Sequence, residues 1–157
     1  MAVVQTTYGD RMAEATAGMV ANTVNWDGVT YLLEDEAPVG FGLAVGAGTG
    51  DKQCSLGGAL TTFLGVTVKD ITLIAGATRT SADTYVKNDN VGVYRMGEVW
   101  VQTTGAAPTR ADPVHYNATT GVFSTSGGSG PVRGARWRKT GANDLALLYL
   151  SGDPQAA

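Results

Sequence analysis

The sequence contains one cysteine, Cys54, and one histidine, His115, among its 157 residues. A single cysteine excludes an internal disulfide, and with it a small secreted domain held together by disulfides. A single histidine leaves little basis for a zinc site or a Ser-His-Asp triad. His115 stands between Val114 and Tyr116 in an alternating pattern typical of a strand. We therefore expect a structural histidine and predict no catalytic, cofactor-binding or metal-binding residue.

Charged residues are also scarce. They make up 16% of the chain, against roughly 25% in typical soluble domains, and the net charge is −3. This balance argues against sequence-independent binding to nucleic acid, which needs clustered basic side chains. Two local clusters stand out: an acidic run at residues 34–36, and a basic group formed by Arg133, Arg136, Arg138 and Lys139. They are either solvated faces or two patches that meet across a subunit contact.

Long apolar runs are absent too. None approaches the roughly 20 residues needed to span a bilayer. The N-terminus has no basic segment followed by an apolar stretch, so no signal peptide is predicted. We therefore expect assembly in the cytoplasm, without a membrane partner. The glycine-rich segments at residues 46–52 and 126–130 lack the spacing of a nucleotide-binding loop and of a nucleophile elbow, respectively.

Short β-type runs, separated by glycine and Ser/Thr-rich loops, make up most of the chain. Its length suits a single domain, and hydrophobic residues at 43% suffice for a packed core. The expected strands lie within residues 29–33, 40–45, 59–68, 71–74, 91–101, 113–116, 121–124, 136–138 and 145–150. About ten short strands at this spacing predict a compact all-β barrel or sandwich with no helix longer than two turns.

Three of these segments carry more specific expectations. Residues 91–101 are predicted to form a hairpin that turns around Gly97, because glycine readily adopts a positive φ. Trp137 lies between two arginines, so it is expected to face inward while both arginines face solvent. The run at residues 145–150 is apolar on both faces, which predicts a central strand.

Residues 1–28 differ from the rest of the chain. Two glycines bracket the one possible helical turn too closely for a stable helix. We expect residues 1–28 to form an extended N-terminal arm and residues 29–157 to form the body, a single domain. An arm cannot bury its own apolar side chains. Met19, Val20 and Trp26 are therefore expected to lie on the body or on a neighbouring protein.

Several segments, taken in order, resemble the capsid cement (head decoration) proteins of tailed bacteriophages. The similar segments are Ala-Gly-Met-Val-Ala-Asn at residues 17–22, Val-Gly-Phe-Gly-Leu-Ala-Val at 39–45, Phe-Leu-Gly-Val-Thr-Val at 63–68, Val-Gly-Val at 91–93, Gly-Glu-Val-Trp-Val at 97–101, Pro-Val-His-Tyr-Asn at 113–117, Thr-Gly-Val-Phe at 120–123 and the closing strand at 145–150. Each motif is small, and the specificity lies in their order and spacing. The resemblance covers most of residues 17–150.

The resemblance implies a non-enzymatic virion protein that binds the outer surface of the capsid. There it would clamp neighbouring subunits of the major capsid protein after the head expands, without a cofactor. The implied partners are the major capsid protein and further copies of this chain, with a trimer favoured over a dimer. The expected contact residues are the apolar residues of the arm and the three arginines: Met19, Val20, Trp26, Arg133, Arg136 and Arg138.

Two alternatives stay open. The first is a β-sandwich module of a tail or fibre that binds host glycan, for which only Tyr8, Trp26 and Trp100 are candidate stacking residues. The second is a trimeric dUTP-hydrolysing enzyme, because that class is all-β, has a similar length and carries a glycine-rich C-terminal motif. The sequence lacks the Asp-Tyr-Arg-Gly type of motif that such enzymes need, and its glycine segment precedes a further apolar strand.

Overall fold

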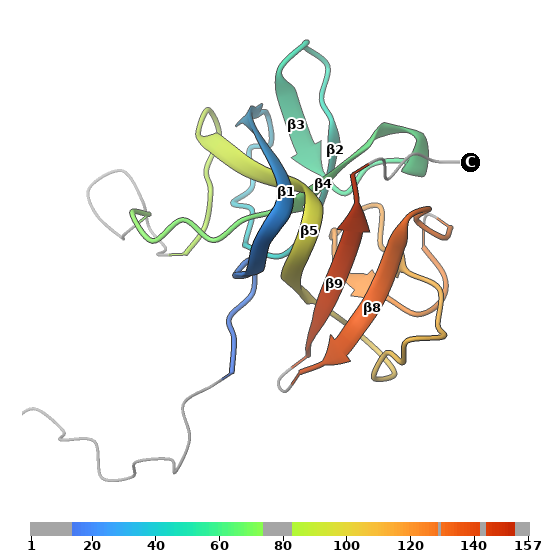
Figure 1. Ribbon diagram of the computed structural model, residues 1–157. Helices are drawn as coiled ribbons and strands as arrows, with labels where there is room; N and C mark the ends of the chain where they lie inside the picture. Colours follow the sequence, from blue (N-terminus) through green and yellow to red (C-terminus); the bar gives the residue numbers. More distant parts are fainter. Residues whose placement is uncertain (1–13, 74–82, 129, 142–143, 153–157) are drawn as a thin grey trace, which may run out of the picture.

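A computed structural model describes residues 14–73, 83–128, 130–141 and 144–152 (Figure 1). The strands are β1 (Val20–Leu33), β2 (Ala44–Ala47), β3 (Gln53–Leu56), β4 (Phe63–Thr67), β5 (Asn90–Gln102), β6 (His115–Tyr116), β7 (Phe123–Ser124), β8 (Ala135–Thr140) and β9 (Leu145–Ser151). The one helical element within these ranges is the short 3-10 turn η1 (Leu60–Thr62). The prediction of a compact all-β fold is confirmed.

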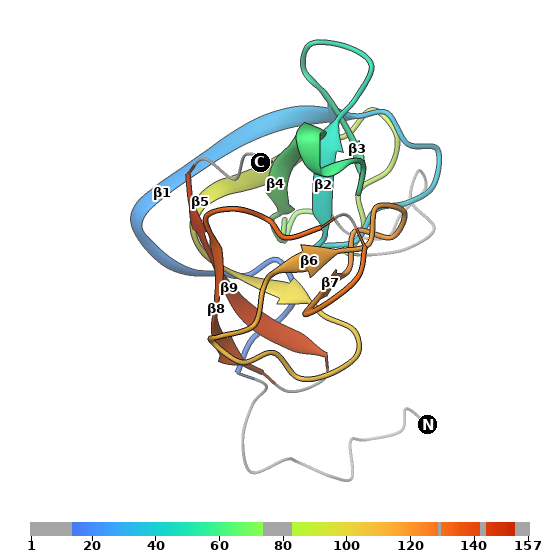
Figure 2. The same cartoon turned by 90° about the vertical axis from the view of Figure 1, so that its right-hand side faces the viewer.

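Seven strands form one sheet in the order β1-β3-β2-β4-β5-β9-β8, and β1 also pairs with β5. This additional pairing closes β1, β3, β2, β4 and β5 into a small barrel. The second half of β5 leaves the barrel and pairs with β9, which in turn pairs with β8. The two-stranded sheet of β6 and β7 lies beside this extension (Figure 2). Because β9 has a strand on each side, its predicted central position is confirmed.

The predicted hairpin at residues 91–101 is wrong: β5 is one continuous strand. Gly97 does adopt a positive φ, +116°, yet the chain runs straight on, because Met96 through Gln102 pair with β9. The reason for the glycine is a close approach. A Cβ at position 97 would lie 2.5 Å from the hydroxyl oxygen of Tyr94. Gly97 therefore makes room for the Tyr94 ring within an unbroken strand.

Strand β1 begins at Val20, so residue 28 lies inside a strand rather than at the end of an arm. Residues 1–13 of the expected arm lie outside the described residues. The ladder between β1 and β5 is interrupted where Asn22 pairs with Glu98 and Asp27 with Met96. Residues 23–26 thus face only Gly97 of β5. They form a large bulge, four residues against one, on the outside of the barrel.

Two hydrophobic clusters fill the fold. One occupies the space between the β5-β9-β8 part of the sheet and the β6-β7 pair, and it includes Trp137, Tyr116, Phe123 and Leu148. The other lies inside the barrel and includes Leu33, Val39, Phe41, Val45, Cys54 and Tyr85. Trp137 is 2% exposed while its two neighbouring arginines are exposed. The predicted alternation along this strand is confirmed.

Candidate functional site

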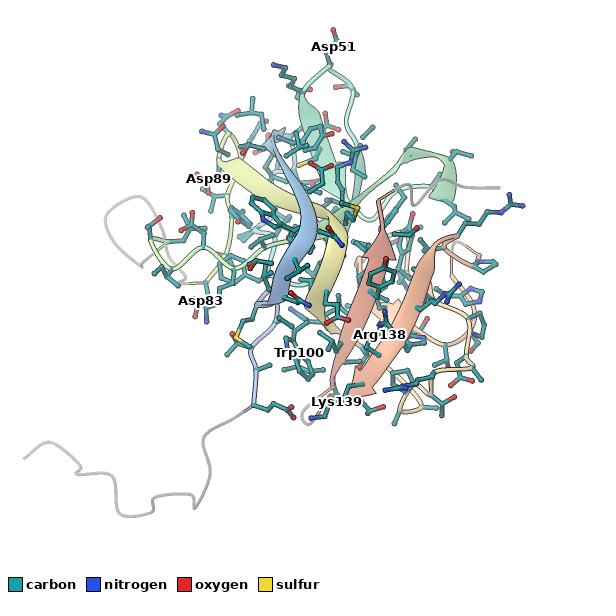
Figure 3. All side chains as sticks on the ribbon, viewed as in Figure 1. Asp51, Asp83, Asp89, Trp100, Arg138 and Lys139 are labelled. Carbon is teal, nitrogen blue, oxygen red and sulfur yellow. The ribbon has the colours of Figure 1, made fainter. Side chains whose placement is uncertain are left out.

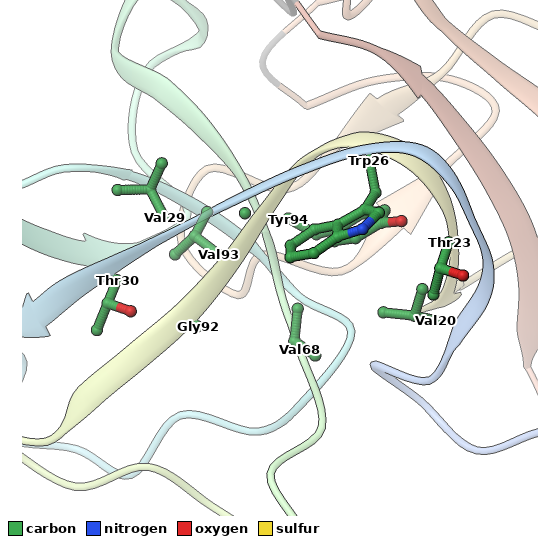
Figure 4. Close-up of a pocket in the computed structure, with 10 residues that line it drawn as sticks. Val20, Thr23, Trp26, Val29, Thr30, Val68, Gly92, Val93 and Tyr94 are labelled. Atoms are coloured by element: carbon green, nitrogen blue, oxygen red, sulfur yellow. The ribbon is translucent and has the colours of Figure 1, made fainter.

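The bulge of β1 presents a half-exposed tryptophan. Trp26 keeps 56% of its surface exposed and stacks parallel to Tyr94, with ring centroids 6.4 Å apart and an interplanar angle of 2°. The stacked pair borders a surface groove of about 420 Å³ (Figure 4). The remaining walls of the groove are mostly apolar and come from β1, from the residue that follows β4 and from β5: Val20, Thr23, Val29, Val68 and Val93.

Local hydrogen bonds hold the bulge in place. The Val24 N–H donates to Oδ1 of Asn22 at 2.8 Å, and Asn25 takes a positive φ of +54°, which asparagine tolerates. The Tyr94 hydroxyl donates to the main-chain oxygen of Asn22 at 2.9 Å. Burial raises the pKa of Tyr94, so this hydroxyl keeps its proton and remains a donor. Because Gly97 leaves space for the Tyr94 ring, one glycine in β5 determines where Trp26 sits in β1.

The three apolar residues expected from the sequence lie close together. Val20 and Trp26 line the same groove, and Met19, just before β1, is 36% exposed. Sequence reasoning missed Val24, which lies in the bulge and is 70% exposed. The sequence does contain a signal for Val24: it lies within residues 12–26, where Glu14 is the single charged residue. A second omission is Ile71, which is 82% exposed on a turn after β4.

The three expected arginines lie on or just before β8, the outer strand of the sheet. Figure 3 shows Arg138 on this strand. Arg138 is held in place: its Nε lies 3.2 Å from Oε1 of Glu98, and its guanidinium lies 4.8 Å above the ring of Tyr149. Arg133 and Arg136 are exposed and form no ion pair with any described residue. These two arginines are therefore the available part of the basic patch.

The acidic run at residues 34–36 is engaged within the chain. Glu34 accepts hydrogen bonds from the N–H and hydroxyl of Thr49, which lower its pKa. Asp35 accepts from the N–H of Leu56 at 2.6 Å, and Glu36 pairs with Lys87. These contacts connect the segment that follows β1 to the loop between β2 and β3, to β3 and to Lys87. They favour a structural role for the acidic run over a contact with the arginines of another subunit.

The side chains best suited to catalysis or metal binding, Cys54 and His115, lie within strands of the fold. Cys54 is fully buried, and desolvation raises the pKa of its thiol to about 12, so it is not a thiolate nucleophile at neutral pH. His115 lies in β6 opposite Ser124. Within the described ranges, no three His, Cys, Asp or Glu side chains gather in a way that could bind a metal ion. The same part of the chain contains no helix of the length and apolarity that a membrane crossing requires.

Comparison with known proteins assigns the chain to a family. A search of curated proteins finds no match. A chain in the solved capsid of the Myoviridae phage XM1 has the same fold, with a TM-score of 0.75 at 17% sequence identity over 96% of this chain and 98% of that one. A family model described as structural cement protein (E217 gp24/Pam3 gp6) matches residues 4–151. With nearly its whole length matched, the chain belongs to the family of structural cement proteins, as its ordered motifs predicted.

Proposed function

We propose that this protein binds the outer surface of a phage head and cements neighbouring subunits of the major capsid protein. The cement would stabilise the expanded shell against the pressure of packaged DNA, and it would require no catalysis. Membership of the cement family supports this structural role over the two alternatives. Trp100 is only 4% exposed, which removes one of the candidate stacking residues for a glycan.

The observation that carries the proposal is that Trp26 is half exposed and that its ring is held in a fixed position. A tryptophan buries roughly 250 Å² when fully covered, so covering its exposed half would contribute roughly 3 kcal/mol. The stacked Tyr94 and the bonded bulge already hold the ring in place. Little side-chain freedom is therefore lost on binding, and rigid aromatic residues of this kind dominate binding energies at interfaces. Met19, Val20 and Val24 would surround this anchor.

The chain before Gly18 is the proposed arm to a second capsid subunit. Gly18 ties the end of this arm to the body, since its N–H donates to the oxygen of Trp100 at 2.7 Å and its oxygen accepts from Lys69 at 2.8 Å. The arm as we now propose it ends near residue 16, because residues 20–28 belong to β1. A body contact through Trp26 and an arm contact elsewhere would join two subunits.

The exposed arginines are a second proposed contact. Arg133 and Arg136 could meet an acidic surface of the capsid, where complementary charge sets orientation and rate of binding more than affinity. We also propose that the protein self-associates on the shell. Copies that are held close together by the lattice bind more tightly than a single copy does.

Binding to expanded heads that lack the protein tests the proposal. Deletion of residues 2–16 should leave a folded body that no longer cosediments with heads. Trp26→Ala should weaken binding by about 30-fold or more, the effect of losing an interface anchor worth 2 kcal/mol. Ile71→Ala is the control, because Ile71 is 82% exposed against 56% for Trp26, yet lies off the bulge. The proposal is refuted if the protein without residues 2–16 and the Trp26→Ala protein both bind heads as well as the wild type does.

A further inference from the structure

One edge of β1 is unpaired over part of its length. Strand β5 lies along one edge, and β3 takes the other only at Leu32 and Leu33. The N–H of Leu33 points to the β5 side, where it donates to the main-chain oxygen of Asp89. The N–H of Leu32 points to the β3 side, where it donates to the main-chain oxygen of Lys52. Alternate residues of a strand point to opposite edges. Thr30 and Gly28 therefore direct their N–H and C=O groups to the edge that no described strand occupies.

The two outer edges of the sheet are treated differently. At β8, Arg136, Arg138 and Lys139 line the edge, and the Nε of Arg110 donates to the main-chain oxygen of Arg138 at 3.2 Å. Such charges and caps are how proteins prevent an edge from pairing with another chain. Strand β1 has a single charged residue, Asp27, and no proline. Apart from the bulge at residues 23–26, β1 has none of these devices, and the edge that follows the bulge is available to pair with another strand.

The charge pattern of β1 favours a second copy of the same strand. In a two-fold contact the same surface faces itself, so a charged strand would repel its copy. Asp27 already has a counter-ion, since its Oδ2 lies 3.7 Å from Nη1 of Arg95. The strands β1 of two copies can therefore meet without setting unpaired like charges against each other.

We infer that two copies of this protein pair antiparallel along β1, with Val29 on the two-fold axis. The usable edge runs over residues 27–31, because the bulge lies before it and β3 takes over at Leu32. With Val29 on the axis, Gly28 exchanges main-chain hydrogen bonds with Thr30 of the partner subunit, and Thr30 does so with Gly28 of the partner subunit. Asp27 then faces Tyr31 of the partner subunit rather than a like charge.

This pairing determines how the docking faces are presented. The two-fold axis of an antiparallel strand pair stands perpendicular to the sheet, so the outer faces of both copies point the same way. Both Trp26 grooves then lie on one side of the dimer. The next step rests on the proposed function. A dimer of this kind would place one groove on each of two neighbouring capsid subunits and gain avidity from the linkage. It is a two-fold dimer and not the trimer expected from the sequence.

The experiment measures the isolated full-length protein, so that its outcome is separate from head binding. Light scattering coupled to size-exclusion chromatography should give a dimer. Thr30→Pro removes an edge donor without touching the bonds to β5 and should give a monomer, with circular dichroism to confirm the fold. Val29→Cys should form a disulfide-linked dimer on mild oxidation, because residues on the axis face each other across the strands. Val24→Cys is the matched control and should stay unlinked.

Three results would overturn the inference: a monomer or trimer of the wild type, a dimer that persists in folded Thr30→Pro, or a dimer in which Val29→Cys does not cross-link. Cys54 is fully buried and does not compete for the disulfide. Should Thr30→Pro fail to fold, the comparison of Val29→Cys with Val24→Cys decides alone. A dimer that cross-links through Val29→Cys but does not bind heads would support the inference and refute the proposed function.

Discussion

Replacement of Gly97 by alanine tests whether β5 positions the exposed tryptophan. The new Cβ would lie 2.5 Å from the Tyr94 hydroxyl oxygen and 2.9 Å from two ring carbons, at a φ of +116°. The backbone conformation alone costs about 1–3 kcal/mol for a residue other than glycine. Displacement of Tyr94 adds roughly 1 kcal/mol for its hydrogen bond to Asn22 and roughly 1 kcal/mol for its stacking on Trp26. The expected loss of stability is about 4 kcal/mol.

Thermal and urea unfolding measure this loss. In a chain of this size each 1 kcal/mol lowers Tm by roughly 2–4 °C, so Gly97→Ala should unfold about 8–16 °C below the wild type. Gly105→Ala is the matched control: Gly105 also has a positive φ, +84°, but nothing lies within 4 Å of its Cβ position. It should lose only the backbone share of about 1–3 kcal/mol. Equal losses in the two proteins would refute the packing argument. Unchanged head binding and unchanged tryptophan fluorescence in Gly97→Ala would refute it as well.

Three further outcomes are expected. Arg136→Glu should weaken head binding and reduce its dependence on salt, measured by cosedimentation at several ionic strengths; an unchanged dependence would make the patch a solvated face. Arg138→Gln removes the partly exposed ion pair with Glu98 and the guanidinium above Tyr149, and it should lower the free energy of unfolding by about 1–2 kcal/mol, measured in urea; a larger loss would contradict this reasoning. Cys54 should resist alkylation in the native protein at neutral pH, since the pKa of its thiol is raised from 9.0 to about 12. Its burial contributes stability that is complete below pH 9 and is lost as the pH rises towards 12, and rapid native labelling would contradict this.

Much of the fold could be predicted from local pattern. Alternation around Trp137 and the apolar run of β9 report burial directly, because each side chain reflects the face on which it lies. The path of β5 could not be predicted this way. A glycine with positive φ serves equally in a turn and beside a close neighbour, and only the pairing with β9, some fifty residues later, distinguishes the two.

The proposed docking residues show the same difference between what local pattern predicts and what distant contacts determine. Apolar character in a segment of weak structure singled out Met19, Val20 and Trp26 from sequence alone. Their rigidity could not be predicted, because it comes from Tyr94, nearly seventy residues away from Trp26. Likewise the arginines near β8 look equivalent in the sequence, yet Glu98 and Tyr149 engage Arg138 and leave Arg136 exposed. Long-range pairing determines which members of a promising cluster are available.

The attachment at Gly18 has a mechanical consequence. A pull on the leading segment meets three main-chain hydrogen bonds at two consecutive residues: Gly18 to Trp100, Lys69 to Gly18, and Trp100 to Met19. These bonds join the root of the segment to β5 and to the chain that follows β4. Load is thereby shared among several strands before β1 can begin to peel away, so tension on a tether would spread through the barrel instead of opening it one bond at a time.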